Sequence, residues 1–171
     1  MRPALIAVLA LSLLGLGATS SSAADLKIGV VDVQYVLQKS KAGKSAKTKL
    51  KSLFDKKQKA IDDKQKTLLD LKAKIENPSG MTTPEKRKEL LQSYQKGLME
   101  LQEEYLKNQQ ELQKKEVDLM KPILKKLEKV LTTMATDGGF DMILNRSEHG
   151  VLFTKPAFNI SDDVLKKLNA G

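Results

Sequence analysis

The stretch "ENPSGMTTPEK", residues 76–86, divides the most highly charged part of the chain into two segments. Pro78, Gly80 and Pro84 interrupt a regular helix, because proline lacks an amide hydrogen and glycine is conformationally permissive. Thr83 followed by Pro84 is typical of a helix start, with threonine as the N-cap and proline as the first helical residue. The stretch therefore predicts that one helix ends just before Pro78 and that a second begins at Pro84.

Both flanking segments repeat apolar residues every seven positions, which is the spacing of a coiled-coil seam. Before the break the row is Phe54, Ile61, Leu68 and Ile75, with Leu50, Lys57, Lys64 and Leu71 between them. After the break the row is Leu91, Leu98, Tyr105, Leu112 and Leu119, with Tyr94, Leu101, Asn108 and Lys115 between them. Folding back at the break would place Leu71 near Leu91 and Phe54 near Asn108. We therefore predict an antiparallel helical hairpin whose seam is interrupted by polar residues.

Short β-like segments lie on either side of this hairpin. Ile28–Val33 ("IGVVDV") predicts a strand, Phe140–Asn145 and Val151–Thr154 predict a β-hairpin, and Ser161 is positioned to cap a short last helix. The expected fold class is α+β, with a small sheet built from both ends of the chain and a long arm. The expected divisions are an arm over 44–120 with its tip near 78–84, and an association body over 25–43 and 121–171.

The first 24 residues resemble a cleaved export signal. Arg2 precedes the mainly apolar stretch Ala4–Gly17, and the small residues Ser22-Ala23-Ala24 follow it. The mature chain is then expected to start at Asp25 in an extracytoplasmic compartment. The sequence has no cysteine and only 4% aromatic residues, so we expect it to depend on packing or self-association rather than on disulfides.

The chain is basic, with a formal net charge of +9, and the charge is concentrated at the start of the arm. Residues 41–59 contain eight lysines and one aspartate, which favours anionic partners. The lysines expected to provide this attraction are Lys44, Lys47, Lys49, Lys51, Lys56, Lys57 and Lys59. Nucleic acid is not expected as a partner, because the chain is exported and lacks aromatic residues interleaved with these lysines.

Catalytic motifs are not found. Gly43-Lys44-Ser45 ends like a phosphate-binding loop, but Gln38 occupies the position of the loop's first glycine. His149 is the only histidine, so neither a metal site nor a Ser-His-Asp triad is expected. We therefore expect no enzyme activity and no cofactor.

Two further features concern binding and motion. Met99, Leu106 and Met120 repeat one position beyond the seam, where they either contact partners or pack against Leu69 or the body. Gly43 and Pro122 fall near the same height of the arm, which predicts either a hinge or a fixed kink there.

Two blocks, "KIGVVDVQYVLQKSKAGKSAKTKL" (27–50) and "KPILKKLEKVLTTMATDGGFDMIL" (121–144), bracket the hairpin, and in this order they resemble the Skp/OmpH family of periplasmic chaperones. The resemblance implies a homotrimer whose three arms hold unfolded outer-membrane proteins without ATP. Sheet positions of the trimerisation body would be Ile28, Val30, Phe140, Met142 and Leu144. Client contacts in the family are diffuse, and the resemblance leads us to expect them here at Phe54, Ile61, Leu68, Ile75, Met81, Met99 and Leu106.

Two other functions remain open at this stage. A structural or tethering coiled coil would use the same seam to bind another helix. A protein that binds anionic lipid or lipopolysaccharide would use the lysines of residues 41–59.

Overall fold

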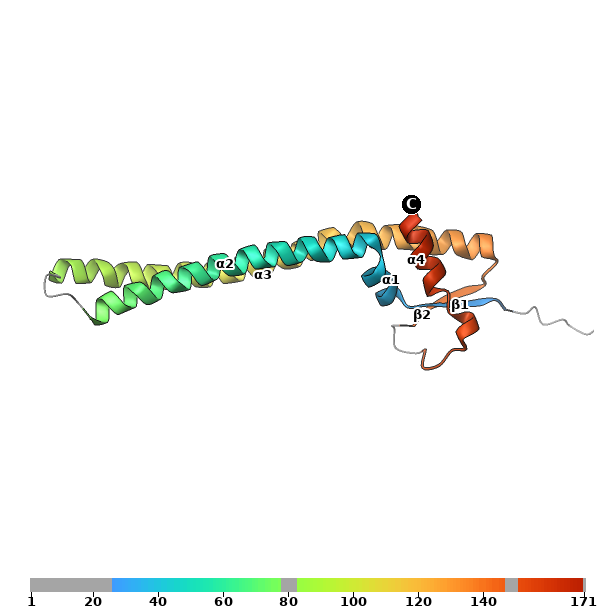
Figure 1. Ribbon diagram of the computed structural model, residues 1–171, viewed down its shortest axis with the longest axis horizontal. Helices are drawn as coiled ribbons and strands as arrows, with labels where there is room; N and C mark the ends of the chain where they lie inside the picture. The colour runs from blue at the N-terminus through green and yellow to red at the C-terminus, as the bar shows by residue number, and fades with distance from the viewer. Residues whose placement is uncertain (1–25, 78–82, 147–150, 171) are drawn as a thin grey trace, which may run out of the picture.

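A computed structural model describes residues 26–77, 83–146 and 151–170 of the chain. The expected signal segment 1–24, the tip residue Met81 and His149 lie outside the described residues. Within the described part, no helix has an apolar stretch long enough to cross a bilayer. A long two-helix arm projects from a small body that contains both ends of the described chain (Figure 1).

The arm consists of α2 (Lys41–Glu76) and α3 (Pro84–Gly138), which run antiparallel. At 1.5 Å per residue, α2 is about 54 Å long and α3 about 82 Å long. Thr83 caps α3 as predicted, because its side chain accepts a hydrogen bond from the amide of Lys86 at 3.3 Å. Gly139 ends α3 with a left-handed backbone at φ 60°. The predicted α+β fold with a helical-hairpin arm is confirmed.

A helix that the sequence reading missed, α1 (Val33–Lys39), joins the first strand to the arm. The strand predicted over Ile28–Val33 ends at Val31, because Asp32 turns the chain into this helix. The Asp32 carboxylate accepts a hydrogen bond from the amide of Tyr35 at 2.8 Å, which is an N-cap interaction.

Ser40 connects α1 to α2 and makes the joint between them tight. Its hydroxyl donates to the carbonyl of Leu37 at 2.9 Å and accepts from the amide of Gly43 at 3.0 Å. A Cβ atom at position 43 would lie 1.8 Å from the Leu37 carbonyl oxygen, so only glycine fits there. Gly43 thus lies within the first turn of α2, which begins at Lys41.

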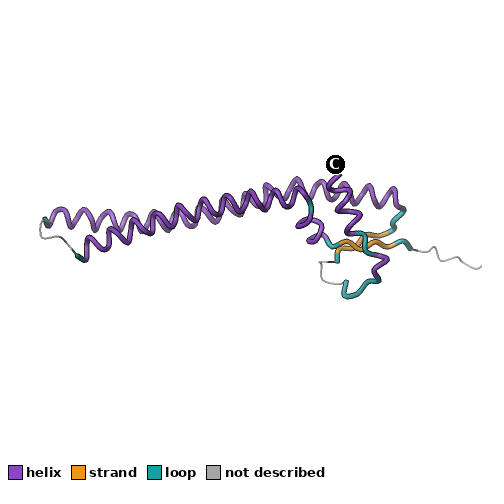
Figure 2. Tube along the Cα trace, viewed as in Figure 1, coloured by secondary structure: helices purple, strands orange, loops and turns teal. Residues whose placement is uncertain are grey.

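The sheet has two strands, β1 (Ile28–Val31) and β2 (Met142–Asn145), which pair in parallel from Ile28 opposite Met142 to Val31 opposite Asn145 (Figure 2). The predicted β-hairpin is wrong, because Val151–Thr154 forms no strand and β2 pairs with β1. The whole arm is thus the crossover between two parallel strands. On the other side of β1, Val30 forms an isolated bridge with Asn159.

The core of the body lies between this sheet, α1, the end of α3 and α4 (Ser161–Ala170). A short 3₁₀ turn (Pro156–Phe158) precedes α4. The Ser161 hydroxyl accepts a hydrogen bond from the amide of Asp32 at 2.9 Å and so connects the two ends of the chain. The buried core residues are Val31, Val36, Leu127, Met134, Ile160, Val164 and Leu168.

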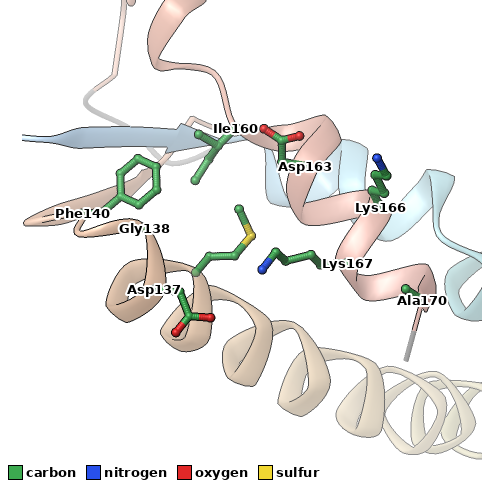
Figure 3. A pocket seen from close by; sticks show the side chains of 9 residues that line it. Asp137, Gly138, Phe140, Ile160, Asp163, Lys166, Lys167 and Ala170 are labelled. Carbon is green, nitrogen blue, oxygen red and sulfur yellow. The ribbon is translucent and has the colours of Figure 1, made fainter.

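The five predicted body residues do not share one sheet face. Ile28 pairs with Met142 and Val30 with Leu144, so these four alternate residues lie on the same face. Gly29 lies between Ile28 and Val30 in β1 and so faces the other side of the sheet. A Cβ atom on Gly29 would be 3.2 Å from the ring of Phe140, which therefore lies on that other face. Its ring borders a pocket of about 570 Å³ beside Ile160, between the end of α3 and α4 (Figure 3). Phe140, predicted as a sheet position, precedes β2, which begins at Met142.

Candidate functional site

The seam of the arm contains buried apolar residues where the two helices approach most closely. Ile61 and Leu68 of α2 are 6% and 7% exposed. Leu68 packs on Gly97 of α3, where a Cβ atom would lie 2.6 Å from the Leu68 Cδ2 atom. Gly97 therefore lets the two helices approach at this level.

Two ionic layers interrupt these apolar contacts. The ammonium group of Lys57 donates to the side-chain oxygen of Asn108 at 2.7 Å and pairs with Glu111. Lys64 pairs with Glu104. The side chains of Lys57 and Glu104 are 16% and 26% exposed, so both layers are partly withdrawn from water. Such pairs contribute little net stability, because desolvation offsets much of their attraction.

The pKa shifts agree with this pairing. The hydrogen bond and charge of Lys57 lower the pKa of Glu111 below its usual value. The hydrogen bond from Lys64 to Glu104 raises the pKa of Lys64, against a smaller opposing effect of burial. The side-chain nitrogen of Asn108 is buried without a hydrogen-bond partner. The seam is therefore closed by charged and incompletely satisfied groups as well as by apolar contacts.

Tyr94, Leu101 and Asn108, which were predicted as seam positions of α3, face α2, whereas the apolar row predicted beside them is exposed in this part of the arm. Leu91, Leu98 and Tyr105, assigned to the seam, are 41%, 44% and 55% exposed. In the middle of the arm, α3 instead presents Tyr94, Gly97, Leu101, Glu104 and Asn108 to α2. The other two residues that face α2, Gly97 and Glu104, each come one position before an exposed member of that row. The observed set lets Glu104 pair with a lysine of α2.

The register differs from the prediction by about one helical turn. We expected Phe54 to lie near Asn108, whereas Lys57 is the residue that contacts Asn108. Phe54 is 50% exposed, and its neighbour Leu53 is half-buried in its place. The register differs because a carboxylate on α3 pairs with each of the seam lysines Lys57 and Lys64. A prediction that matches apolar residues alone does not take these ion pairs into account.

The row Leu91, Leu98, Tyr105, Leu112 and Leu119 becomes more buried toward the base, where its last two members are half-buried. A straight helix turns about 20° per heptad relative to a strict seven-residue repeat. Near the tip of the arm this row therefore lies beside the seam, and near the base of the arm it lies in the seam. The parallel row Met99, Leu106 and Met120 follows the same course, from 65% and 53% exposed to half-buried.

The two sides of the arm differ in chemistry. Leu68 and Gly97 face each other, and in an antiparallel pair the residues that follow them in sequence turn to the same side. We call this side the apolar flank; it carries Phe54, Leu69, Leu91, Leu98 and Tyr105. The opposite side, the polar flank, has an open pocket of about 430 Å³ lined by residues that include Lys64, Glu100, Glu103 and Lys107.

The predicted client-binding residues are divided between seam and surface. Ile61 and Leu68 are buried inside the arm, and Ile75 is half-buried. Met99 and Leu106 are more than half exposed, so neither packs against the body. Leu69, their alternative packing partner, is itself 66% exposed. Phe54 is half exposed, so six of the seven residues can be placed by their exposure, and Met81 lies outside the described residues.

The lysine field is only partly available to a partner. Lys57 is held in the seam, Lys51 pairs with Asp55 at 2.7 Å, and Lys59 pairs with Asp63 at 3.4 Å. The side chains of the other four predicted lysines are exposed and form no ion pair within the described residues. These are Lys44, Lys47, Lys49 and Lys56.

The proposed hinge positions have different surroundings. Gly43 is packed against the Leu37 carbonyl at the start of α2, whereas Pro122 is exposed inside α3, which continues through it to Gly138. Motion at these positions stays a prediction. Within the described residues, no cluster of histidine, cysteine and carboxylate side chains is suited to hold a metal ion.

Comparison with known proteins gives a family match and a structural match of the whole fold. The family model described as Outer membrane protein (OmpH-like) matches residues 27–168. The crystal structure of an OmpH-like protein from Caulobacter crescentus CB15, assigned as an outer membrane chaperone, superposes with a TM-score of 0.75. The two sequences are 15% identical, and the match covers 85% of each chain, so this likeness is one of fold. No protein of curated function matches the sequence.

Proposed function

This chain belongs to the family of OmpH-like outer membrane proteins, and we propose that it is a periplasmic chaperone. In this proposal it acts as an ATP-independent holdase that binds unfolded outer-membrane proteins and prevents their aggregation before membrane insertion. The structural neighbour, itself assigned as an outer membrane chaperone, supports this role through its shared fold.

The observation that carries the proposal is the apolar flank of the arm. Leu91, Leu98 and Tyr105 lie at successive heptads of α3 and are between 41% and 55% exposed, and Leu69 is 66% exposed. Contiguous exposed apolar residues on a soluble protein mark an interaction surface. Along about 21 Å of helix, given 1.5 Å per residue, they form a line of contacts rather than a single pocket.

Such a line suits an unfolded β-barrel precursor. A barrel strand alternates apolar and polar side chains, and before folding its apolar side chains are exposed to water. Covering apolar surface yields about 25 cal/mol per Å², so each contact is weak and their sum is substantial. Many weak contacts on one arm can retain a chain without selecting its sequence, and the chain leaves when it folds.

The exposed lysines at the root of the arm supply a second, weaker attraction. Lys44, Lys47, Lys49 and Lys56 extend into solvent and would attract acidic segments of a client. This part of the binding is screened over about 10 Å at 0.1 M salt, whereas the apolar contacts are not.

We also propose that the body assembles into a homotrimer. Large apolar side chains are exposed around its sheet and the segment before α4, and they need cover in a soluble protein. They are Leu26, Met142, Leu152, Phe153 and Phe158, which are 71%, 52%, 98%, 84% and 38% exposed. Sedimentation equilibrium of the mature chain tests this part: the proposal predicts three times the chain mass, and a monomer overturns it.

The holdase proposal is tested by light scattering after a urea-unfolded outer-membrane β-barrel protein is diluted into buffer. We expect the protein to suppress scattering at a stoichiometric ratio of trimer to client. Replacing Leu98 and Tyr105 with glutamine on the apolar flank should reduce the suppression.

The matched control replaces Glu100 and Lys107 with glutamine on the polar flank, which leaves the net charge unchanged. It should suppress scattering as well as the unsubstituted protein does. If the unsubstituted protein fails to suppress scattering, the holdase proposal is wrong and a tethering role is favoured. Equal losses in both variants would show that the apolar flank is not the binding surface.

A further inference from the structure

An apolar cleft of about 200 Å³ lies at the root of the arm, between the end of α1, the start of α2 and α3. Its walls include Leu37, Ala46, Leu50, Leu119 and Met120. A wider hollow of about 530 Å³ shares Leu37 and Met120 with the cleft and extends along α1. We call these two neighbouring hollows together the root groove.

The root groove is continuous with the exposed apolar rows of α3. The row Leu91, Leu98 and Tyr105 leads through Leu112 to Leu119, and the row Met99 and Leu106 leads to Met120. Leu119 and Met120 are both walls of the cleft. A chain lying along the first row would therefore meet an apolar side chain at every seventh position up to the cleft, whereas Gln113 interrupts the second row.

The size and chemistry of the groove favour an aromatic or large aliphatic side chain on an extended polypeptide. A dry apolar cavity of about 150 Å³ is enough to bind benzene. Gln34 and Gln38 lie one turn apart on α1, and their exposed amides form no hydrogen bond within the described residues. Such amides can both donate to and accept from a peptide backbone.

The charged residues at the edge of the cleft do not favour binding of an anionic lipid headgroup. Lys47 and Glu116 both line the cleft and bring one positive and one negative charge. An anionic headgroup would be attracted by Lys47 and repelled by Glu116, whereas a neutral peptide segment meets no such conflict.

We propose that the root groove is an anchor site for one aromatic or large aliphatic side chain of an unfolded polypeptide whose neighbouring residues lie along the apolar rows. The anchor rests on the proposed holdase function and specifies where a client binds most tightly. It gives an otherwise diffuse surface one defined contact at the base of the arm.

Methionine methyl NMR on the full mature protein tests this inference. The probe is a disordered serine-glycine-threonine peptide that carries a single central phenylalanine, and the same peptide with alanine is its control. An aromatic ring in the cleft shifts the methyl signal of Met120, so the phenylalanine peptide should move this signal and the alanine peptide should not. The methyl of Met134, 7% exposed in the core of the body, should stay in place with both peptides.

A substitution that fills the cleft with a larger side chain provides a second test of the anchor site. Ala46 is 7% exposed and lines the cleft, so Ala46→Leu should occupy it and weaken binding of the phenylalanine peptide by about tenfold or more. Thr48→Leu adds a leucine at an exposed position of the same helix and should leave the affinity unchanged. If Ala46→Leu fails to fold, the Met120 signal of the unsubstituted protein still decides the question.

The results of these experiments distinguish a failure of the proposed anchor site from a failure of the proposed holdase function. An unmoved Met120 signal in a protein that suppresses client aggregation overturns the anchor alone. A protein that neither suppresses aggregation nor binds the peptide overturns both. The anchor is also wrong if phosphatidylglycerol vesicles move the Met120 signal as the peptide does, or if rising protein concentration moves it without peptide, which would assign the groove to a second copy of the chain.

Discussion

Replacing the ionic layer Lys64–Glu104 with two leucines should stabilise the arm. In the folded chain the side chains of these residues are 42% and 26% exposed, so more than half of each is already covered by the partner helix. Leucines there would turn an ionic layer into an apolar one next to Leu68. The replacement therefore tests directly whether the charged residues in the seam lower the stability of the arm.

The expected gain follows from the coverage of the two side chains. Full burial of a leucine contributes about 1.5–3 kcal/mol, so partial burial of two contributes about 2–4 kcal/mol. The methylenes of Lys64 are already covered, which reduces this gain, and a partly exposed ion pair is worth at most about 1 kcal/mol. We therefore expect the double variant to be more stable by about 1–2 kcal/mol.

The assay is urea unfolding followed by far-ultraviolet circular dichroism, with all variants at one protein concentration because assembly contributes to apparent stability. The matched control replaces Lys96 and Glu100, an exposed pair at 77% and 50%, with leucines, and should change stability by less than about 0.5 kcal/mol. If the variant of residues 64 and 104 is no more stable than this control, the ionic layer does not weaken the seam and the reasoning is refuted.

Three further outcomes follow from the described contacts. Gly43→Ala should destabilise the protein by about 1–3 kcal/mol in the same urea assay, because its Cβ atom would collide with the Leu37 carbonyl; an unchanged midpoint would show that the joint relaxes freely. The pKa of Glu111 is lowered by Lys57, so its contribution is present above the unfolded value near pH 4.3 and is lost as pH falls through the folded value. The stability difference between the unsubstituted protein and Glu111→Gln should therefore shrink between pH 7 and pH 2, and a constant difference would contradict the pairing. Client affinity measured by fluorescence anisotropy should fall only in part between 0.05 and 0.5 M salt, whereas complete loss would make binding purely electrostatic.

The arm could be predicted from the sequence because its signals are local. Pro78, Gly80 and the Thr83-Pro84 pair mark the break, and heptad spacing marks both helices. The orientation of α3 within the arm could not be predicted from apolar residues alone. Glu104 lies opposite the seam lysine Lys64, and this pairing of opposite charges was the signal that could have corrected the register.

The body was predicted less well because its contacts are distant in sequence. β1 and β2 are four residues each, and their pairing spans the entire arm. Such short strands carry no signal for partner or direction, so two neighbouring apolar segments were wrongly joined as a hairpin. No element was predicted for residues 34–39 of α1, although Asp32 at the N-cap was the available sign of a helix.

Site-specific photo-crosslinking tests the central claim most directly. The claim is that an unfolded polypeptide is held on the apolar flank of the arm. p-Benzoylphenylalanine replaces either Leu98 on the apolar flank or Ser93, an exposed residue beside Lys96 on the polar flank, and a urea-unfolded β-barrel protein is added before irradiation. The account predicts a clearly higher yield of crosslinked client from position 98. Equal yields, or a higher yield from position 93, would contradict it.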